Sequence, residues 1–251
     1  MKIRLLSDMH LEMPYNHAPR HNKPFVYEYL GEDVIVLAGD IHTQNFHDEF
    51  LQQLPTDVKI IMIAGNHEAY GQSFDSVHTA MKDLETRFAN FKYLNNEGYT
   101  IGDVEFFGGT MFTSLTGEHC ERDCPRFIPD FSVVHQNGKT RTTQDHKNDH
   151  DKFCKELVLW KSITEGAKKR VVISHFVPTW KALDPKFANS SLNGYFIEDM
   201  EMYMAGIDVW MFGHTHGSHN FMIEDTRLVC NPFGYNQENI DGFDTNKVIE
   251  V

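Results

Sequence analysis

The chain has 251 residues, of which 41% are apolar and 24% are charged, and its formal net charge is −13. These values are typical of an ordinary globular protein with a substantial core, and the length is long for one domain without clearly indicating two. The negative charge would repel a phosphate backbone, which argues against nonspecific binding of nucleic acid.

Nothing in the sequence predicts secretion or a membrane span. Asp8 and His10 interrupt any apolar segment at the N-terminus, and no apolar run approaches the length of a bilayer span. The four cysteines form no disulfide framework for a chain of this size, so we expect free thiols in a reducing compartment. The sequence therefore favours a cytoplasmic protein without membrane partners.

Strand and helix signals alternate over the first third of the chain. Short apolar runs of the kind that forms buried strands occur at 2–7, 34–39 and 58–64. A short helical stretch is expected near 46–54. Apolar residues then recur at spacings of three and four from Phe74 to Phe88, which predicts an amphipathic helix packed on a sheet. Residues 99–104 and 105–111 are bracketed by glycines and predict a hairpin or two consecutive strands.

The composition changes between about 113 and 150, where aliphatic residues become rare and polar residues dominate. A loop of that length inside a compact fold is usually functional or disordered. We therefore interpret 113–150 as an insertion, or lid, over the site, within a single domain that spans residues 1–251. The histidines and acidic residues in and beside this stretch are interpreted as surface groups: His135, His146, His150, Asp123, Asp130, Asp145, Asp149 and Asp151. The alternative is that one of the three histidines reaches the substrate.

A second amphipathic helix follows, with apolar residues from Phe153 to Ile163. After a strand at 171–173, a polar stretch at 178–196 leads to a short helix expected around 197–205. The chain ends with four predicted strands, near 209–213, 219–224, 227–231 and 247–251. Alternating strands and helices followed by a strand-rich end indicate an α/β fold in one domain.

Candidate metal ligands follow the predicted strands in five separate motifs. The motifs are Ser7-Asp8-Met9-His10, Gly39-Asp40, Gly65-Asn66-His67-Glu68, Ser174-His175 and Gly213-His214-Thr215-His216. Functional groups collect beyond the carboxyl ends of strands in α/β sheets. The seven candidates are Asp8, His10, Asp40, Asn66, His175, His214 and His216. Five such motifs, whose candidate ligands are all Asp, Asn or His, predict a polynuclear metal centre.

The order of these motifs resembles that of the calcineurin-like metallophosphoesterases. The match runs from Asp8 to His216, and no metal-ligand position of the pattern is missing. The segment Asn231-Pro232-Phe233-Gly234-Tyr235 is also similar to the closing segment of that family. The resemblance implies a four-layer α-β-β-α sandwich of two mixed sheets.

The resemblance also implies two ligand sets that share Asp40. One ion would take Asp8, His10, Asp40 and His216, and the other would take Asp40, Asn66, His175 and His214. These ligands suit divalent ions, with Mn favoured and Fe, Zn or Ni as alternatives. Two such ions would neutralise the phosphoryl oxygens, and a hydroxide bridging them would attack the phosphorus in line.

His67 stands outside the ligand list. In the resembling family the histidine at this position lies beside the metals and contacts the phosphoryl group. We therefore assign His67, with Asp40 and Asn66, to the catalytic group, and expect His67 to donate a proton to the leaving alkoxide. The alternative is that His67 only shapes its turn.

The expected function is hydrolysis of a small phosphodiester, such as a cyclic nucleotide, by a two-metal enzyme. Protein phosphatases of the family extend Gly-Asp and Gly-Asn-His with arginines that are absent here, although Arg122, Arg126 or Arg141 of the insertion would be substitutes. A phosphomonoesterase or protein phosphatase therefore stays open. A nuclease is disfavoured by the acidic charge, and a catalytically silent scaffold by the complete ligand set. The expected partner is a small phosphorylated substrate, and the sequence indicates no oligomeric state.

Overall fold

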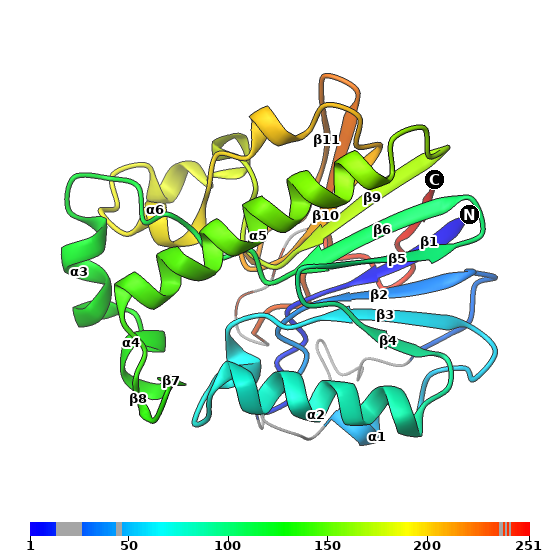
Figure 1. Ribbon diagram of the computed structural model, residues 1–251, viewed down its shortest axis with the longest axis horizontal. Helices are drawn as coiled ribbons and strands as arrows, with labels where there is room; N and C mark the ends of the chain where they lie inside the picture. The colour runs from blue at the N-terminus through cyan, green and yellow to red at the C-terminus, as the bar shows by residue number, and fades with distance from the viewer. Residues whose placement is uncertain (14–26, 44–46, 236–237, 239, 241) are drawn as a thin grey trace.

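Two β-sheets pack against each other, and helices cover the outer face of each sheet (Figure 1). The computed structural model describes residues 1–13, 27–43, 47–235, 238, 240 and 242–251. Each sheet contains parallel and antiparallel strand pairs. The four-layer sandwich of two mixed sheets that the family resemblance implied is confirmed.

The first sheet has the strand order β13-β1-β2-β3-β4. Its strands are β1 (Lys2–Leu6), β2 (Val34–Ala38), β3 (Lys59–Ile63), β4 (Phe91–Tyr93) and β13 (Val248–Glu250). The first four run parallel to one another, and β13 runs antiparallel to β1 at the edge. The sequence did not predict β4, because three residues are too short to give a periodic signal.

The second sheet has the strand order β11-β12-β10-β9-β6-β5. Its strands are β5 (Glu97–Ile101), β6 (Val104–Gly109), β9 (Lys169–Ser174), β10 (Val209–Phe212), β11 (His219–Ile223) and β12 (Thr226–Cys230). The four central strands are parallel, whereas β5 and β11 pair antiparallel at the edges. The predicted hairpin is confirmed as β5 and β6, which begin and end about two residues earlier than expected.

The central strands β1, β2 and β3 of the first sheet are buried on both faces, because one face meets the second sheet and the other meets helices. Side chains alternate between the faces of a strand. In β2, Val34 and Val36 belong to the core between the sheets. Ile35 and Leu37 point to the opposite face and join the core under the helices. Burial of both faces explains why the sequence of β2 is continuously apolar and does not alternate between apolar and polar residues.

The outer layers are built mainly from two amphipathic helices, α2 (Phe74–Arg87) on the first sheet and α5 (Thr143–Ile163) on the second (Figure 1). α2 begins where the Ser73 hydroxyl accepts a hydrogen bond from Ser76 N, and it buries the predicted apolar stripe. The expected stretch at 46–54 contains the short helix α1 (His47–Leu51), while residue 46 lies outside the described residues. None of the helices in the described part of the chain combines the length and the apolar character of a membrane span.

The stretch 113–150 contains regular structure. It holds α3 (Cys120–Phe127), α4 (Asp130–Val133), the short strands β7 (His135–Gln136) and β8 (Lys139–Thr140), and the start of α5. The sequence placed the start of α5 after residue 150, but the helix begins at Thr143. A capping box fixes that start, because the Thr142 hydroxyl accepts from Asp145 N and the Asp145 carboxylate accepts from Thr142 N. The function of the stretch as a lid stays a prediction.

The region after β9 contains short turns rather than the helix expected around 197–205. It comprises η2 (Trp180–Ala182), η3 (Pro185–Phe187), α6 (Asn193–Phe196) and η4 (Glu201–Tyr203). Met200 and Met204, which flank η4, are buried. The segment therefore packs through isolated buried side chains, which give no helical period.

Candidate metal centre

All seven candidate ligands lie at the carboxyl ends of five parallel strands. β1 is followed by Asp8 and His10, β2 by Asp40, and β3 by Asn66. From the second sheet, β9 is followed by His175, and β10 by His214 and His216. Because the two sheets pack face to face, their strand ends open onto one place, as expected for an α/β active site.

The backbone at most of these positions has an unusual conformation. Five candidates have positive φ angles: Asp8 (52°), His10 (45°), Asp40 (54°), His214 (67°) and His216 (46°). Such angles are uncommon for residues other than glycine and persist only where the surroundings enforce them. Two backbone hydrogen bonds between the first two loops do this, from Asp8 N to Gly39 O and from His10 N to Asp40 O, each at 3.0 Å.

Glycines in the motifs make room for the carboxylates. A Cβ atom added to Gly213 would lie 2.7 Å from Asp8 Oδ2, and one added to Gly65 would collide with the carboxylate of Asp40. Real Cβ atoms do not approach so closely, so both positions require glycine for close approach.

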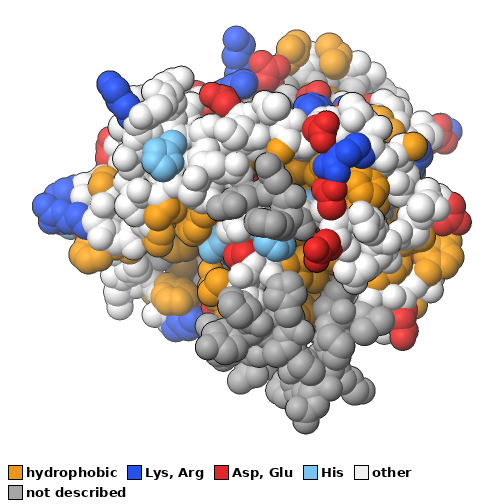
Figure 2. Space-filling view, turned by 90° about the horizontal axis from the view of Figure 1, so that it is seen from below, with side chains coloured by type: hydrophobic (Ala, Val, Ile, Leu, Met, Phe, Trp, Pro, Cys, Tyr) orange, Lys and Arg blue, Asp and Glu red, His pale blue; other side chains and the backbone are white. Residues whose placement is uncertain are grey.

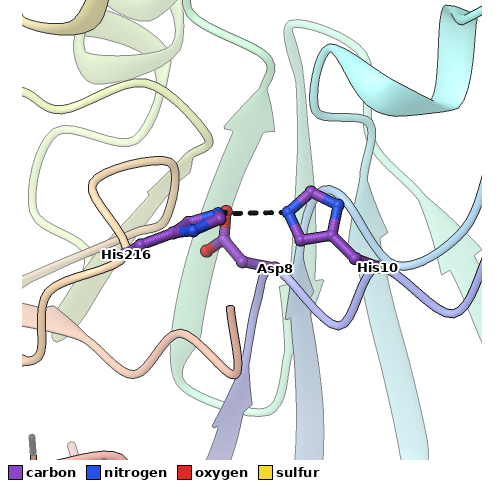
Figure 3. A group of neighbouring side chains, drawn as sticks. All are labelled: Asp8, His10 and His216. Carbon is purple, nitrogen blue, oxygen red and sulfur yellow. Dashed lines mark hydrogen bonds and ion pairs between the residues drawn. The ribbon is translucent and has the colours of Figure 1, made fainter. Parts of the chain in front are cut away.

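The first cluster comprises Asp8, His10 and His216, which converge from both sheets (Figure 3). The Nε2 atoms of His10 and His216 are 3.1 Å apart. His216 Nε2 also lies 3.6 Å from Asp8 Oδ1. The ligand atoms all fall within 4.8 Å of one another, which is close enough to hold one ion.

The second cluster comprises Asp40, His175 and His214, with Asn66 beside them. His175 Nε2 is 3.2 Å from Asp40 Oδ2, from Asn66 Oδ1 and from His214 Nδ1. Asp40 also approaches the first cluster, because its Oδ2 lies 3.9 Å from His10 Nε2. Burial opposes ionisation of Asp40, but the charges of His175 and His67 outweigh it and hold the pKa of this carboxyl well below its usual range.

The outer nitrogens of three histidines determine how their inner nitrogens face the clusters. His10 Nδ1 pairs with Glu12 at 3.1 Å, His216 Nδ1 pairs with Glu238 at 2.6 Å, and His175 Nδ1 lies 3.0 Å from Ala38 O. All three partners are acceptors, so in the neutral tautomers each Nδ1 carries the proton and each Nε2 presents a lone pair inward.

This arrangement fits divalent ions. In these neutral tautomers the lone pairs of His10 and His216 face each other, with the two Nε2 atoms 3.1 Å apart. A divalent cation held by both histidines would remove this repulsion, because imidazole nitrogens bind such ions through these lone pairs. In the second cluster His214 presents Nδ1, which lies 3.2 Å from His175 Nε2, so this nitrogen is placed as its ligand atom.

His67 lies beside both clusters but is turned differently from the ligands. Its backbone N donates to Asp40 Oδ1 at 2.8 Å, and its Nδ1 pairs with Glu12 at 3.1 Å. The ring stacks on Tyr70, and Nε2 lies 3.4 Å from Tyr235 Oη. Burial lowers the pKa of His67, but the charges of Asp40 and Glu12 outweigh this and raise it to about 9. In the absence of bound cations, His67 therefore carries a proton at neutral pH.

Sequence reasoning missed three carboxylates that hold the site together. Glu12 bridges His10 and His67, and burial opposes its charge but hydrogen bonds from both histidines lower its pKa to about 2. Glu238 orients His216, and Asp130 accepts from Asn66 Nδ2. Only Glu12 had a signal in the sequence, because it continues the alternate spacing of Asp8 and His10 along one extended turn.

The surface assignment was wrong for part of the insertion. Asp130 is fully buried, and hydrogen bonds from Asn66, Tyr70 and Tyr195 satisfy its carboxylate there. His146 is also fully buried, and its ring packs among Phe112, Phe131 and Phe176. Asp123 is largely buried as well and accepts from Ser191. The polar composition of the stretch predicted exposure, but these polar groups are buried because each has a partner inside the fold.

A cavity of about 870 Å³ opens onto the metal-ligand clusters. Its floor includes Asp40, Asn66, His214 and His216, and its walls include Phe187 and Phe196. Figure 2 shows histidine and acidic side chains reaching the surface close together near the centre of one face, with hydrophobic side chains beside them.

The walls come mostly from the region after β9 rather than from the predicted lid. The stretch 113–150 contributes Ile128, Pro129 and Asp130. Residues 177–197 contribute eleven lining residues: Val177, Leu183, Asp184, Lys186, Phe187, Ser190, Leu192, Asn193, Tyr195, Phe196 and Ile197. The polar stretch at 178–196 therefore shapes the cavity more than the insertion does.

The sequence profile of the calcineurin-like phosphoesterases matches residues 1–218. An uncharacterized protein of Acanthamoeba polyphaga mimivirus is 25% identical over 258 residues, covering 94% of this chain and 92% of the viral protein.

Two solved structures are similar in fold. The phosphopantetheinyl hydrolase of Mycobacterium tuberculosis superposes with a TM-score of 0.65 at 14% identity, over 94% of this chain and 90% of that one. A putative 5′-nucleotidase of Staphylococcus aureus gives a TM-score of 0.53 at 15% identity, over 94% of this chain but only 48% of that one. At such identities the likeness concerns the fold.

Proposed function

This chain belongs to the calcineurin-like phosphoesterase family, whose members are hydrolases of phosphoesters that depend on two divalent metal ions, and we propose that its substrate is a small phosphodiester such as a cyclic nucleotide. The proposed ligand sets are those inferred from the motifs, with Asp40 shared between the two ions. The two close clusters around Asp40 support this assignment.

The charge of the cavity wall is the observation that carries the preference for a diester. Among the described lining residues, Lys186 is the one lysine or arginine, and its Nζ pairs with Asp184 at 2.7 Å. A phosphodiester carries one negative charge, whereas a monoester carries up to two at neutral pH. A wall with so little positive charge is better matched to the single charge.

The arginines of the insertion do not supply the missing charge. Arg141 is buried, where its guanidinium lies over Phe112 and pairs with Asp149. Arg122 pairs with Asp123 beside it. Neither lines the cavity, and neither does Arg126. This weakens the alternative of a protein phosphatase, which needs such groups to grip a phosphomonoester.

The apolar part of the wall suits a sizeable organic group on the substrate. Leu183, Phe187 and Phe196 line the cavity, and the Phe196 ring stacks near His214 at 5.1 Å between centroids. Concave sites of several hundred Å³ with apolar walls and few polar groups are typical of small-molecule sites. The names of the two similar structures refer to a phosphopantetheinyl group and to nucleotides, and both name a phosphate joined to a larger organic group.

The proposed chemistry divides the work between ions and side chains. When bound, two divalent ions neutralise the phosphoryl oxygens and lower the pKa of water so that it can attack. His67 is held by Glu12 through Nδ1, which leaves Nε2 directed toward the cavity. From there His67 donates a proton to the leaving oxygen, and Tyr235, 3.4 Å from that nitrogen, lies beside the same position.

A hydrolysis screen in Mn²⁺ tests this proposal. Bis-p-nitrophenyl phosphate, p-nitrophenyl phosphate, 3′,5′- and 2′,3′-cyclic mononucleotides and single-stranded DNA are compared at equal concentration. We expect faster turnover of the aryl diester and of at least one cyclic nucleotide than of the monoester or the DNA. Faster hydrolysis of p-nitrophenyl phosphate would instead support a phosphomonoesterase, and no turnover by metal-loaded protein would support a scaffold.

A further inference from the structure

Asp130, the first residue of α4, reaches from the insertion into the second ligand set. Its side chain is fully buried. Oδ1 accepts hydrogen bonds from Asn66 Nδ2 at 3.0 Å and from Tyr70 Oη at 2.9 Å, and Oδ2 accepts from Tyr195 Oη at 2.6 Å. The carboxylate of α4 therefore binds two other segments, the turn after β3 that carries Asn66 and Tyr70, and α6, which carries Tyr195.

The contact with Asn66 matters because the two ends of an amide are chemically opposite. A metal ion is bound by the oxygen, whereas the nitrogen only donates hydrogen bonds. An ionised carboxylate only accepts, so it can hold the Nδ2 end of Asn66 but not the Oδ1 end. With Nδ2 on Asp130, Oδ1 is turned toward the second cluster, where it lies 3.2 Å from His175 Nε2.

The opposite orientation would be penalised twice. Oδ1 of Asn66 would face the carboxylate of Asp130, placing two acceptors about 3 Å apart in a buried site, and Nδ2 would face the ion. The surroundings favour the same result, because Asn66 Nδ2 also lies 3.3 Å from Tyr70 Oη, whose proton is directed to Asp130.

We propose that Asp130 is a positioning residue that fixes the amide of Asn66 for metal binding and so sets the affinity of the ion held by Asp40, Asn66, His175 and His214. This inference rests on the proposed dinuclear centre. It also assigns the insertion a supporting role at the metals, in addition to the small part of the cavity wall that it forms. Outer partners of this kind typically change metal affinity by about 10–100-fold.

The test measures Mn²⁺ binding by isothermal titration calorimetry, starting from protein stripped with chelator. Asp130→Asn keeps the shape of the side chain but allows its nitrogen to turn toward Asn66. We expect about 10–100-fold weaker binding of one ion and little change for the other. Asp149→Asn is the matched control, because Asp149 also belongs to the insertion but pairs with Arg141.

An exchange of the two side chains separates positioning from a general structural role. Asn66→Asp alone places two carboxylates against each other and should also weaken one ion. The double variant Asn66→Asp with Asp130→Asn restores one amide against one carboxylate, so we expect it to recover most of the lost affinity. Thermal melting in chelator should differ little between Asp130→Asn and the wild type.

Three results would overturn the inference. The first is wild-type affinity for both ions in Asp130→Asn, and the second is equal weakening of both ions together with a large drop in melting temperature. The third is a lack of recovery of affinity in the exchanged pair.

The proposed function fails in a different way. If the wild-type protein binds fewer than two ions, the ligand assignment is wrong, and the positioning role falls with it. If it binds two ions but turns over no diester, the role of Asp130 stands while the substrate assignment fails.

Discussion

His67 touches Asp40 through its backbone and Glu12 through its ring, so its side chain lies beside the ligand sets rather than within them. Replacing His67 with Ala should leave metal content intact and lower kcat by about 10²–10⁴-fold, the usual contribution of a positioned proton donor. The loss should be greatest for an alkoxide leaving group and smaller for p-nitrophenolate, which needs little protonation. Steady-state kinetics on a matched alkyl and aryl diester, with metal analysis, measure this.

His119→Ala provides the control, because His119 is exposed beside α3. It should have wild-type kinetics on both substrates. Equal losses on the two leaving groups in His67→Ala would remove the proton-donor role, and a loss of metal would show that His67 only shapes its turn.

Asp40 belongs to the second cluster and also approaches the first, with Oδ2 at 3.2 Å from His175 Nε2 and 3.9 Å from His10 Nε2. Asp40→Asn should lower turnover more than Asp8→Asn, because a neutral amide leaves the repulsion between two cations uncompensated. Its metal content should fall below that of Asp8→Asn, which belongs to one cluster only. Near wild-type turnover of Asp40→Asn would show that it does not bridge the ions.

The sequence identified the candidate ligands but not the residues that orient them. Asp8, Asp40 and His175 stand directly after apolar strands, so local pattern was enough to find them. Glu238 and Asp130 lie far along the chain from His216 and Asn66, and only the folded backbone brings each pair together. Hydrogen bonds between distant segments leave no periodic signal in a single sequence, which is why these partners were missed.

At the level of elements, α5 shows how a local signal was overlooked. The polar composition before Phe153 suggested a loop, but Thr142 and Asp145 form a capping box that starts the helix well before that residue. Ile163, expected on its apolar stripe, is 74% exposed at the other end. The start of the helix was therefore misplaced, whereas its end at Ile163 and the burial of its packing residues Leu157 and Trp160 are as expected.

The capping box gives a direct stability prediction. Thr142→Ala removes the hydroxyl that accepts from Asp145 N, and it should lower the free energy of unfolding by about 1 kcal/mol. Urea denaturation measures the change. Thr143→Ala, one position inside the helix, should have a smaller effect, since Thr143 makes no capping contact. Equal effects of the two substitutions would show that the box does not stabilise the helix start.

η3 gives a prediction about selectivity. Phe187 lines the cavity yet is 51% exposed, and Lys186 Nζ lies 4.8 Å from the centre of its ring. Phe187→Ala should raise KM for phosphodiesters that carry a large apolar group, because such a group reaches this wall. It should change KM little for phosphodiesters that carry only methyl groups. Met202→Ala is the control, since Met202 is 79% exposed on η4 and does not line the cavity. An unchanged preference in Phe187→Ala would place specificity elsewhere.

At the scale of the whole molecule, the fold was predictable because its strands are short apolar runs and its motifs come in a recognisable order. The structure of the segment that forms the cavity wall was not predictable. This segment follows β9 and folds into short turns such as η3 and α6, which have no repeating pattern. The same lack of pattern explains why Asp130 was interpreted as a surface group although the fold buries it. Specificity and support of the site depend on these irregular segments.

The centre also joins the two sheets, and this leads to a prediction about stability. Asp8, His10, Asp40 and Asn66 come from the first sheet, while His175, His214 and His216 come from the second. Ions bound between them cross-link the layers and neutralise Asp8 and Asp40, which are both buried. An ion that binds only the folded protein stabilises it by about 2.7 kcal/mol at a free concentration 100 times its Kd. For a chain of this length that corresponds to a rise in Tm of about 5–10 °C.

Differential scanning calorimetry of chelated protein with increasing Mn²⁺ measures this effect. Tm should rise steadily with the concentration of free Mn²⁺, and added chelator should reverse the rise. Asp40→Asn, which weakens the contact of both clusters with the ions, should show a much smaller rise, whereas His119→Ala should behave like the wild type. A Tm that does not depend on Mn²⁺ in the wild type would mean that the ions do not link the two sheets, because any ligand bound only to the folded state must raise its stability.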